Sequence, residues 1–344
     1  MITVYSPDHK LQDGGQELFA GQLVPCFEKP ARAEMVLSAV KDRGLGPVIG
    51  PDKLDLAALE RIHAPEYLNF LASFWEDWTA AGFTHNALPV STPTSWMRMR
   101  EPKCIDGRIS LYSYDCTTPI TPGTWRAATS SARVALTAQK RISNGASSAF
   151  ALCRPPGHHA FSDAYGGYCF LNNAAIATQG FLDSGAKKVA ILDVDYHHGN
   201  GTQAIFYGRS DVFFASLHGH PEWSYPYFLG YDDERGEGEG EGFNRNCPLQ
   251  PGTGATAWFA ALETLLKDIQ KFGPDALVIS LGVDTYEGDP ISHFKLKSDD
   301  FLRLGERIGR EKYPSLFVFE GGYAVDDLGV NVANVLEGFE AMAG

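Results

Sequence analysis

The sequence has no apolar run long enough for a membrane-spanning helix and no closely spaced cysteines. A membrane helix needs roughly 18 consecutive apolar residues, so we expect no membrane span. The first residues, MITVYSPDHKLQDGG, lack the basic-then-apolar pattern of a signal peptide. The six cysteines form no C-x-x-C pair, which disfavours a zinc finger or a redox motif. These absences predict a cytoplasmic protein with reduced cysteines.

Positive charge is also scarce. The 344 residues include 29 Lys and Arg against 42 Asp and Glu, which gives a formal net charge of −13. No cluster of Lys and Arg provides the positive stripe that nucleic acid binding requires, so we expect no nucleic acid partner. A small cationic substrate would instead be attracted. With 44% apolar and 21% charged residues, the composition is that of a globular protein.

Short apolar runs alternate with stretches of helical periodicity, which predicts an α/β fold with a parallel sheet between helices. The predicted strands are 147–153, 187–195, 211–218, 275–284 and 314–322, and the predicted helices are 172–185, 255–272 and 299–311. Residues 80–123, rich in Pro, Thr and Ser, depart from this pattern, and we interpret them as an inserted excursion without a core element. Residues 232–242, DDERGEGEGEG, predict a flexible solvated loop.

Polar clusters follow several predicted strands, where parallel sheets bind ligands. The sharpest is D-V-D-Y-H-H-G-N-G at 193–201. Because side chains alternate along a strand, Asp193, Asp195 and His197 are expected on one side. Asp284 leaves another strand and can join them. Two aspartates and a histidine suit a catalytic Zn²⁺ with an open position, although such ligands also admit Fe²⁺, Co²⁺ or Mn²⁺.

Two further motifs predict catalytic side chains. R-P-P-G-H-H places the adjacent His158 and His159 at a strand end, where imidazoles beside a metal suit general acid and base catalysis. E-G-G-Y ends on Tyr323, and its paired glycines allow a backbone that presents the tyrosine hydroxyl to a substrate oxygen.

Taken in order, R-P-P-G-H-H, G-G-Y-C-F-L-N-N, D-V-D-Y-H-H-G-N-G-T, S-L-G-V-D-T-Y-E-G-D-P and E-G-G-Y resemble the histone deacetylase superfamily. Within it the chain is most similar to the bacterial acetylpolyamine amidohydrolases. The resemblance covers essentially the whole chain. It implies the arginase-deacetylase fold, with residues 1–344 in a single domain around an eight-stranded, mostly parallel sheet flanked by helices.

The resemblance also implies roles for individual residues. Asp195, His197 and Asp284 match the zinc ligands, His158 and His159 the tandem histidines, and Tyr323 the oxyanion-binding tyrosine. Asp193 and Asn200 match the groups that orient the two histidines, while Tyr168 and Tyr225 match the aromatic walls of a narrow acyl channel. The Gly167 carbonyl is expected to accept a hydrogen bond from the substrate amide. A structural K⁺ site is implied at Asp193, Asp195, His197, Ser216 and Leu217.

Two positions differ from the pattern of many relatives. Asn200 stands where many of them have an aspartate, which predicts a less basic His159. In the excursion, Asp106 matches an acidic residue that binds the cationic amine in polyamine enzymes. Thr117 stands where those enzymes have a second such acidic residue. In relatives the excursion builds a dimer that narrows the active-site entrance, so we expect 80–123 at a homodimer interface.

The sequence therefore predicts zinc-dependent hydrolysis of N-acetyl amides to acetate and free amine. Small acetylated diamines such as acetylputrescine and acetylcadaverine are the expected substrates, with acetyl-lysine in proteins as an alternative. A two-metal ureohydrolase of the same fold would need further carboxylates, for which Asp289 is the obvious candidate. A non-catalytic module that binds acetylated amines is a third interpretation.

Overall fold

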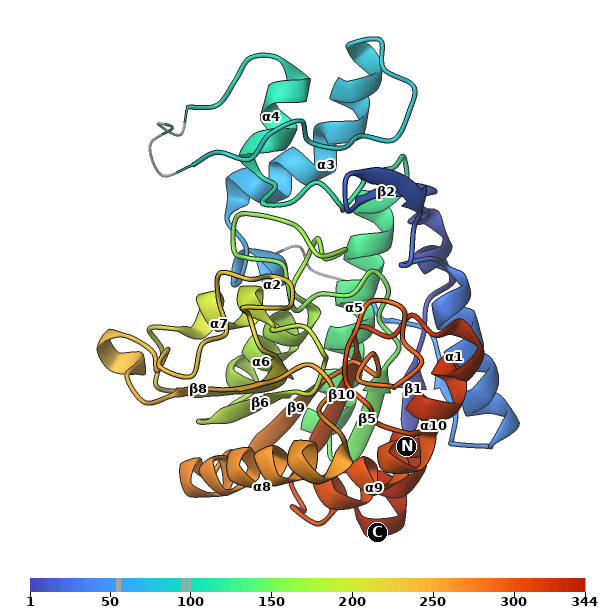
Figure 1. The fold of residues 1–344 in the computed structure, drawn as a ribbon, viewed down its shortest axis with the longest axis vertical. Helices are drawn as coiled ribbons and strands as arrows, with labels where there is room; N and C mark the ends of the chain where they lie inside the picture. The colour runs from blue at the N-terminus through green and yellow to red at the C-terminus, as the bar shows by residue number, and fades with distance from the viewer. Residues whose placement is uncertain (54–56, 95–96, 98–99, 344) are drawn as a thin grey trace.

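An eight-stranded sheet forms the centre of the molecule (Figure 1). The computed structural model describes residues 1–53, 57–94, 97 and 100–343. Every strand pair in the sheet is parallel. The strands in spatial order are β4 (Val48–Ile49), β1 (Ile2–Val4), β5 (Ser148–Ala151), β10 (Ser315–Phe319), β9 (Ala276–Leu281), β6 (Val189–Asp193), β7 (Val212–Gly219) and β8 (Asn244–Leu249).

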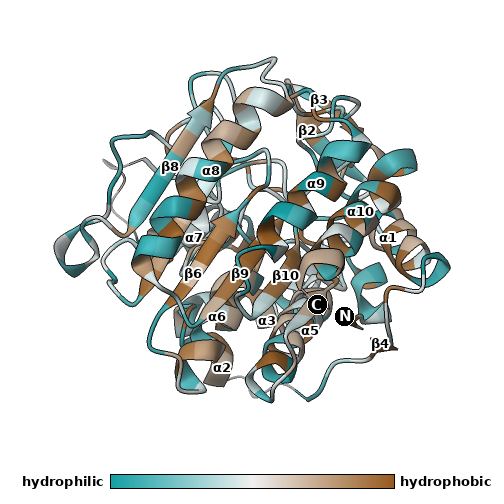
Figure 2. Ribbon diagram, turned by 90° about the horizontal axis from the view of Figure 1, so that it is seen from below, coloured by the Kyte–Doolittle hydropathy of each residue, from teal (hydrophilic) through white to brown (hydrophobic). Residues whose placement is uncertain are grey.

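Helices cover both faces of this sheet. One layer contains α3 (Pro65–Ala80), α5 (Thr124–Ser143) and α6 (Asn173–Asp183), and the other contains α1 (Ala31–Asp42), α8 (Ala255–Phe272), α9 (Ser298–Gly309) and α10 (Val325–Ala343). The shorter α2 (Ala57–Glu60), α4 (Ile105–Leu111) and α7 (Asn200–Phe206) join them. Figure 2 shows the hydrophobic strands β6, β9 and β10 behind α8 and α9, whose ribbons alternate between hydrophilic and hydrophobic residues.

The sequence of the strands explains the two layers. In β5, Ala149 and Ala151 pack in the core under α5, whereas Phe150 packs in the core on the opposite face. Adjacent side chains thus enter different cores, as the period of a strand requires. Both sets are apolar, which is typical of a parallel strand covered on both faces. The predicted α/β fold with its flanking helices is therefore confirmed.

Three strands of the sheet escaped the sequence-based prediction. β1 and β4 are too short to show a pattern, and β8, with the sequence NRNCPL, carries too few apolar residues. Outside the main sheet, β2 (Gln16–Phe19) and β3 (Gln22–Pro25) form an antiparallel hairpin. A 3-10 helix, η1 (Pro7–Leu11), precedes that hairpin.

The interpretation of residues 80–123 as an excursion without a core element was partly wrong. Helix α4 lies inside it, and Ile105 and Ile109 are buried in the core under α3. This four-residue apolar spacing was masked by the surrounding Pro, Thr and Ser. Residues 95–96 and 98–99 of the excursion lie outside the described residues. Figure 1 shows α3 and α4 at one end of the molecule, away from α8 and α9.

The acidic loop at 232–242 is mostly exposed, as predicted, but it is not featureless. It contains a 3-10 helix, η2 (Gly238–Gly240), in which Gly240 is buried. None of the helices in the described part of the chain is both long and apolar enough to cross a membrane.

Candidate active site

The candidate site lies beyond the carboxyl ends of four neighbouring strands. β5 leads to His158 and His159, β6 to Asp195 and His197, β9 to Asp284, and β10 to Tyr323. These strands are adjacent in the order β5, β10, β9, β6. Because all are parallel, their ends meet at one edge of the sheet. The sheet thus unites residues that are up to 165 positions apart in the chain.

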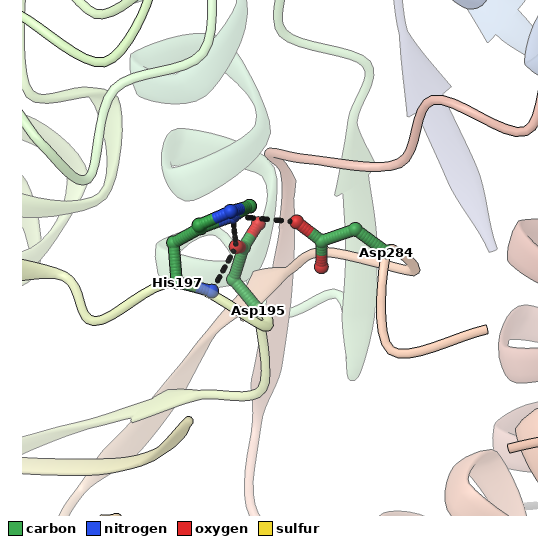
Figure 3. A group of neighbouring side chains, drawn as sticks. All are labelled: Asp195, His197 and Asp284. Atoms are coloured by element: carbon green, nitrogen blue, oxygen red, sulfur yellow. Dashed lines mark hydrogen bonds and ion pairs between the residues drawn. The ribbon is translucent and has the colours of Figure 1, made fainter. Parts of the chain in front are cut away.

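Asp195, His197 and Asp284 form one compact group (Figure 3). One potential ligand atom from each lies within 4.8 Å of the others, and all three residues are buried. The Nδ1 atom of His197 lies 3.0 Å from Oδ2 of Asp284 and 3.3 Å from Oδ1 of Asp195. Two carboxylates and one imidazole facing a common point are suitable for holding a catalytic divalent metal.

The electrostatics of this group fit a cation. Both aspartates are fully buried, and burial together with the negative charge of Asp195 raises the pKa of Asp284 to about 8. A divalent cation between them would offset that repulsion. Gly321 completes the fit, since a Cβ atom there would lie 2.5 Å from an oxygen of each aspartate. Only glycine allows the β10 loop to pass this close.

Asp289, the additional ligand that a two-metal ureohydrolase would need, has another partner. Its Oδ2 accepts a hydrogen bond from the Tyr323 backbone N–H at 2.7 Å, and its Oδ1 accepts one from the Ile291 N–H. Among the described residues, the candidate metal group does not include it. Asp289 therefore orients the tyrosine loop, and the arrangement favours a single-metal site.

The two adjacent histidines have different partners. His158 Nδ1 lies 3.0 Å from Asp193 Oδ2, whereas His159 Nδ1 lies 2.7 Å from Asn200 Oδ1. Their rings are 4.0 Å apart between centroids. As the sequence predicts, a carboxylate orients the first histidine and a neutral amide the second.

These partners affect the two histidines in opposite directions. Burial disfavours the charged form of His158, but Asp195 and Asp193 outweigh it and raise its pKa to about 10. For His159, burial and the positive charges of His158 and His197 lower the pKa well below its usual value. His159 is consequently the neutral member of the pair, able to accept a proton, and His158 is the member that retains one.

Tyr323 is held from behind by a buried arginine that sequence reasoning did not identify. The Arg32 guanidinium lies 4.7 Å from the centroid of the Tyr323 ring and donates hydrogen bonds to the carbonyls of Gly322 and Glu320. Its charge is balanced by Glu28. Nothing in a single sequence distinguishes this arginine from a surface residue of α1.

A cavity of about 400 Å³ leads to these groups. Its inner part is formed by His159, His197 and Tyr323, and Tyr168 and Tyr225 form walls, as predicted. Gly167 also lines it and has a φ of 55°; a Cβ atom there would lie 2.3 Å from the His159 ring. A close approach of the backbone to His159 therefore requires glycine at 167.

Two carboxylates behind the walls were not found from the sequence. The Tyr168 hydroxyl donates to Glu17 in β2 at 2.8 Å, and the Tyr225 hydroxyl donates to Asp115 in the excursion at 2.9 Å. Asp115 Oδ2 also accepts the Gly167 backbone N–H at 2.6 Å. One aspartate thus links both sides of the channel.

The remaining predicted residues are placed as follows. Asp106 is exposed on α4 and does not line the cavity, whereas Thr117 does. Asp193, the last residue of β6, pairs with Ser216 inside β7. The predicted K⁺ residues are thus on two neighbouring segments: Asp193, Asp195 and His197 at and after the end of β6, and Ser216 and Leu217 within β7. Their role in binding K⁺ stays a prediction.

Comparison with known proteins gives consistent results. The histone deacetylase domain matches residues 26–339. The chain is 56% identical over 342 residues to acetylpolyamine amidohydrolase 2 of Pseudomonas aeruginosa, with 99% of each chain covered. It is 58% identical over 347 residues to acetylpolyamine amidohydrolase 1 of the same organism, with 100% of both covered.

A solved structure agrees with these matches. The crystal structure of acetylpolyamine aminohydrolase from Burkholderia pseudomallei superposes with a TM-score of 0.95 at 40% identity, and all of both chains is covered. The similarity therefore extends over the whole chain, including the excursion.

Proposed function

The chain belongs to the histone deacetylase family, and from that premise we propose that it hydrolyses small cationic N-acetyl amines to acetate and free amine, using zinc. The observation that carries this proposal is the position of the buried Asp195, His197 and Asp284 group. It lies beside two histidines and a tyrosine at the inner end of a 400 Å³ cavity. When bound, zinc supplies Lewis acidity toward the acetyl carbonyl and makes water more acidic.

The histidines divide the proton transfers. His159, paired with the neutral Asn200, is suited to accept a proton from the attacking water. His158, paired with Asp193, is suited to remain protonated and to donate to the leaving amine. Their rings lie 4.0 Å apart between centroids, and each lies beside a residue of the candidate metal group, His158 beside Asp195 and His159 beside His197.

Tyr323 orients and stabilises the carbonyl oxygen of the substrate. Its hydroxyl can donate a hydrogen bond to the oxygen as negative charge develops there. Asp289 fixes its backbone N–H, and Arg32 lies against its ring. A side chain constrained on both sides is preorganised, which lowers the cost of reaching the transition state.

The substrate is proposed to be a small acetylated diamine, such as acetylputrescine or acetylcadaverine. Support comes from the names of the two Pseudomonas aeruginosa relatives and from the net charge of −13, which attracts cations. Tyr168 and Tyr225 line the cavity, and their ring faces suit the apolar methylene groups of an unbranched chain. Acetyl-lysine has the same acetylated chain end and is the alternative.

A comparison of turnover tests this proposal. Zinc-loaded enzyme would be supplied with acetylcadaverine, acetylspermine and an acetyl-lysine peptide, and acetate release would be measured. We expect the highest kcat/KM for acetylcadaverine. Faster cleavage of the peptide would refute the small-amine assignment, and binding without acetate release would favour a non-catalytic module.

We further propose a homodimer that uses the excursion and a cytoplasmic location. The excursion exposes Val90 and Met97, with 82% and 55% of their surface accessible, and burial of these two apolar side chains would stabilise an interface formed there. All six cysteines are unpaired, which is consistent with a reducing compartment. Light scattering that gives the mass of one chain would refute the dimer.

A structural K⁺ is proposed between the end of β6 and the neighbouring residues Ser216 and Leu217 of β7. Support comes from the register of Asp193 with Ser216, which brings the predicted cation residues together. Loss of thermal stability on exchange of K⁺ for a large organic cation would be the expected result.

A further inference from the structure

The outer end of the active-site cavity is aromatic and contains no carboxylate. Phe19 from β2 and Trp223 and Tyr227 from the loop after β7 line it, with 45%, 60% and 51% of their surface exposed. None of the described residues that line the cavity is Asp or Glu. A cationic substrate that enters here therefore meets ring faces. We call Phe19, Trp223 and Tyr227 the aromatic mouth.

A series of ring contacts connects this mouth to the catalytic histidine. The His159 ring lies 5.1 Å from the Tyr225 ring, and the Tyr225 ring lies 6.2 Å from the Tyr227 ring, between centroids. Two ring contacts therefore lead from the buried histidine to the half-exposed Tyr227. The two centroid distances taken together are of the order of the length of an extended, unbranched diamine with about five carbons.

The backbone of the mouth is held in an unusual conformation. Only four non-glycine residues in the described chain have positive φ, and three of them line this cavity: Ala20, Tyr168 and Tyr227, at 48°, 68° and 68°. A bulky aromatic residue at positive φ is strained by roughly 1–3 kcal/mol, and such strain is concentrated at functional sites. The conformation of Tyr227 is thus a reason to assign it a function.

The carboxylates behind the walls strengthen the attraction of the rings for a cation. The hydroxyls of Tyr168 and Tyr225 donate to Glu17 and Asp115, away from the cavity. A phenol that donates to a carboxylate has more electron density on its ring. The ring faces of Tyr168 and Tyr225 that line the cavity are therefore more negative, while the carboxylates of Glu17 and Asp115 do not line it.

Given the proposed function, on which this inference rests, we propose that the aromatic mouth binds the free ammonium end of the acetylated diamine through cation–π contacts. Trp223 is the strongest of the three rings for this purpose. Within one chain, the site thereby selects a cation without Asp106, which lies outside the cavity, and without an acidic residue at position 117, where threonine stands.

The test compares two substrates of equal length. Acetylcadaverine carries a terminal ammonium, and N-hexylacetamide has a methyl group in its place. Trp223→Leu and Tyr227→Leu remove a ring, whereas Trp223→Phe and Tyr227→Phe retain one. Each Leu variant is expected to lose about twofold to fivefold in kcat/KM for acetylcadaverine, chiefly through KM, because exposed cation–π contacts are of this strength. For N-hexylacetamide the change should stay below twofold, and the Phe variants should resemble the wild type.

Several results would overturn the inference. Equal losses for both substrates would mean that the mouth contributes apolar contact only. An unchanged preference for acetylcadaverine in both Leu variants would assign the ammonium to carboxylates that a second copy contributes. Trp223 does not have a positive φ, so Trp223→Leu remains informative if Tyr227→Leu does not fold. If the wild type released acetate from neither substrate, the proposed function itself would fail, which is a distinguishable result.

Discussion

Asp115 makes the most specific prediction about the channel. Its Oδ2 accepts hydrogen bonds from the Tyr225 hydroxyl at 2.9 Å and the Gly167 backbone N–H at 2.6 Å. Asp115→Ala removes the acceptor of both hydrogen bonds, so Tyr225 and Gly167 are no longer linked through one carboxylate. A hydrogen bond to a charged group contributes about 1.5 kcal/mol at a half-buried position, so the two together amount to about 3 kcal/mol.

If this free energy is expressed in the transition state, kcat/KM falls about 100-fold. Asp115→Asn retains one acceptor oxygen and should lose about tenfold. Tyr225→Phe removes only one donor and should lie closer to the wild type. The assay is acetate release from acetylcadaverine under steady-state conditions, with thermal unfolding measured in parallel.

The controls separate positioning from general instability. Asp233→Ala removes an exposed carboxylate in the acidic loop and should leave kcat/KM within twofold of the wild type. Asp115→Ala with wild-type kcat/KM would refute the reasoning. So would a loss that disappears when the assay is run well below the unfolding temperature of the variant.

Two further changes test neighbouring contacts. Burial raises the pKa of Glu17 from 4.5 to about 7, so the folded state binds more protons than the unfolded state in this window and stability falls as pH rises through it. As pH rises from 4.5 to 7, the free energy of unfolding of Glu17→Gln should therefore increase relative to that of the wild type, by at most about 3 kcal/mol. A difference in Tm between the two proteins that is independent of pH would contradict this. Asp289→Asn leaves one oxygen for the N–H groups of Tyr323 and Ile291 and should lower kcat about tenfold at unchanged metal content. Loss of metal in that variant would instead identify Asp289 as a ligand.

The sequence predicted the features that depend on short continuous motifs. The cluster at 193–201 and Asp284 each follow a long apolar strand, so the parallel sheet necessarily brings them to one edge. The unequal partners of His158 and His159 were predicted from the family resemblance, which matches Asp193 and Asn200 to the groups that orient the two histidines.

The contacts that hold the channel could not be read in this way. Glu17, Arg32 and Asp115 come from a hairpin, a helix and the excursion, and each acts on a residue at least 50 positions away. Their functions depend on tertiary contacts that no local pattern encodes. Helix α4 was missed for a related reason, since its stability comes from burial of two isoleucines rather than from a helical sequence.

Titration of metal-free enzyme with zinc tests the central claim most directly. Acetate release from acetylcadaverine should rise linearly with added zinc and reach its maximum at one equivalent per chain, because Asp195, His197 and Asp284 form a single group. Asp284→Ala should show no such rise. A maximum at two equivalents, or no acetate at any zinc concentration, would contradict the account.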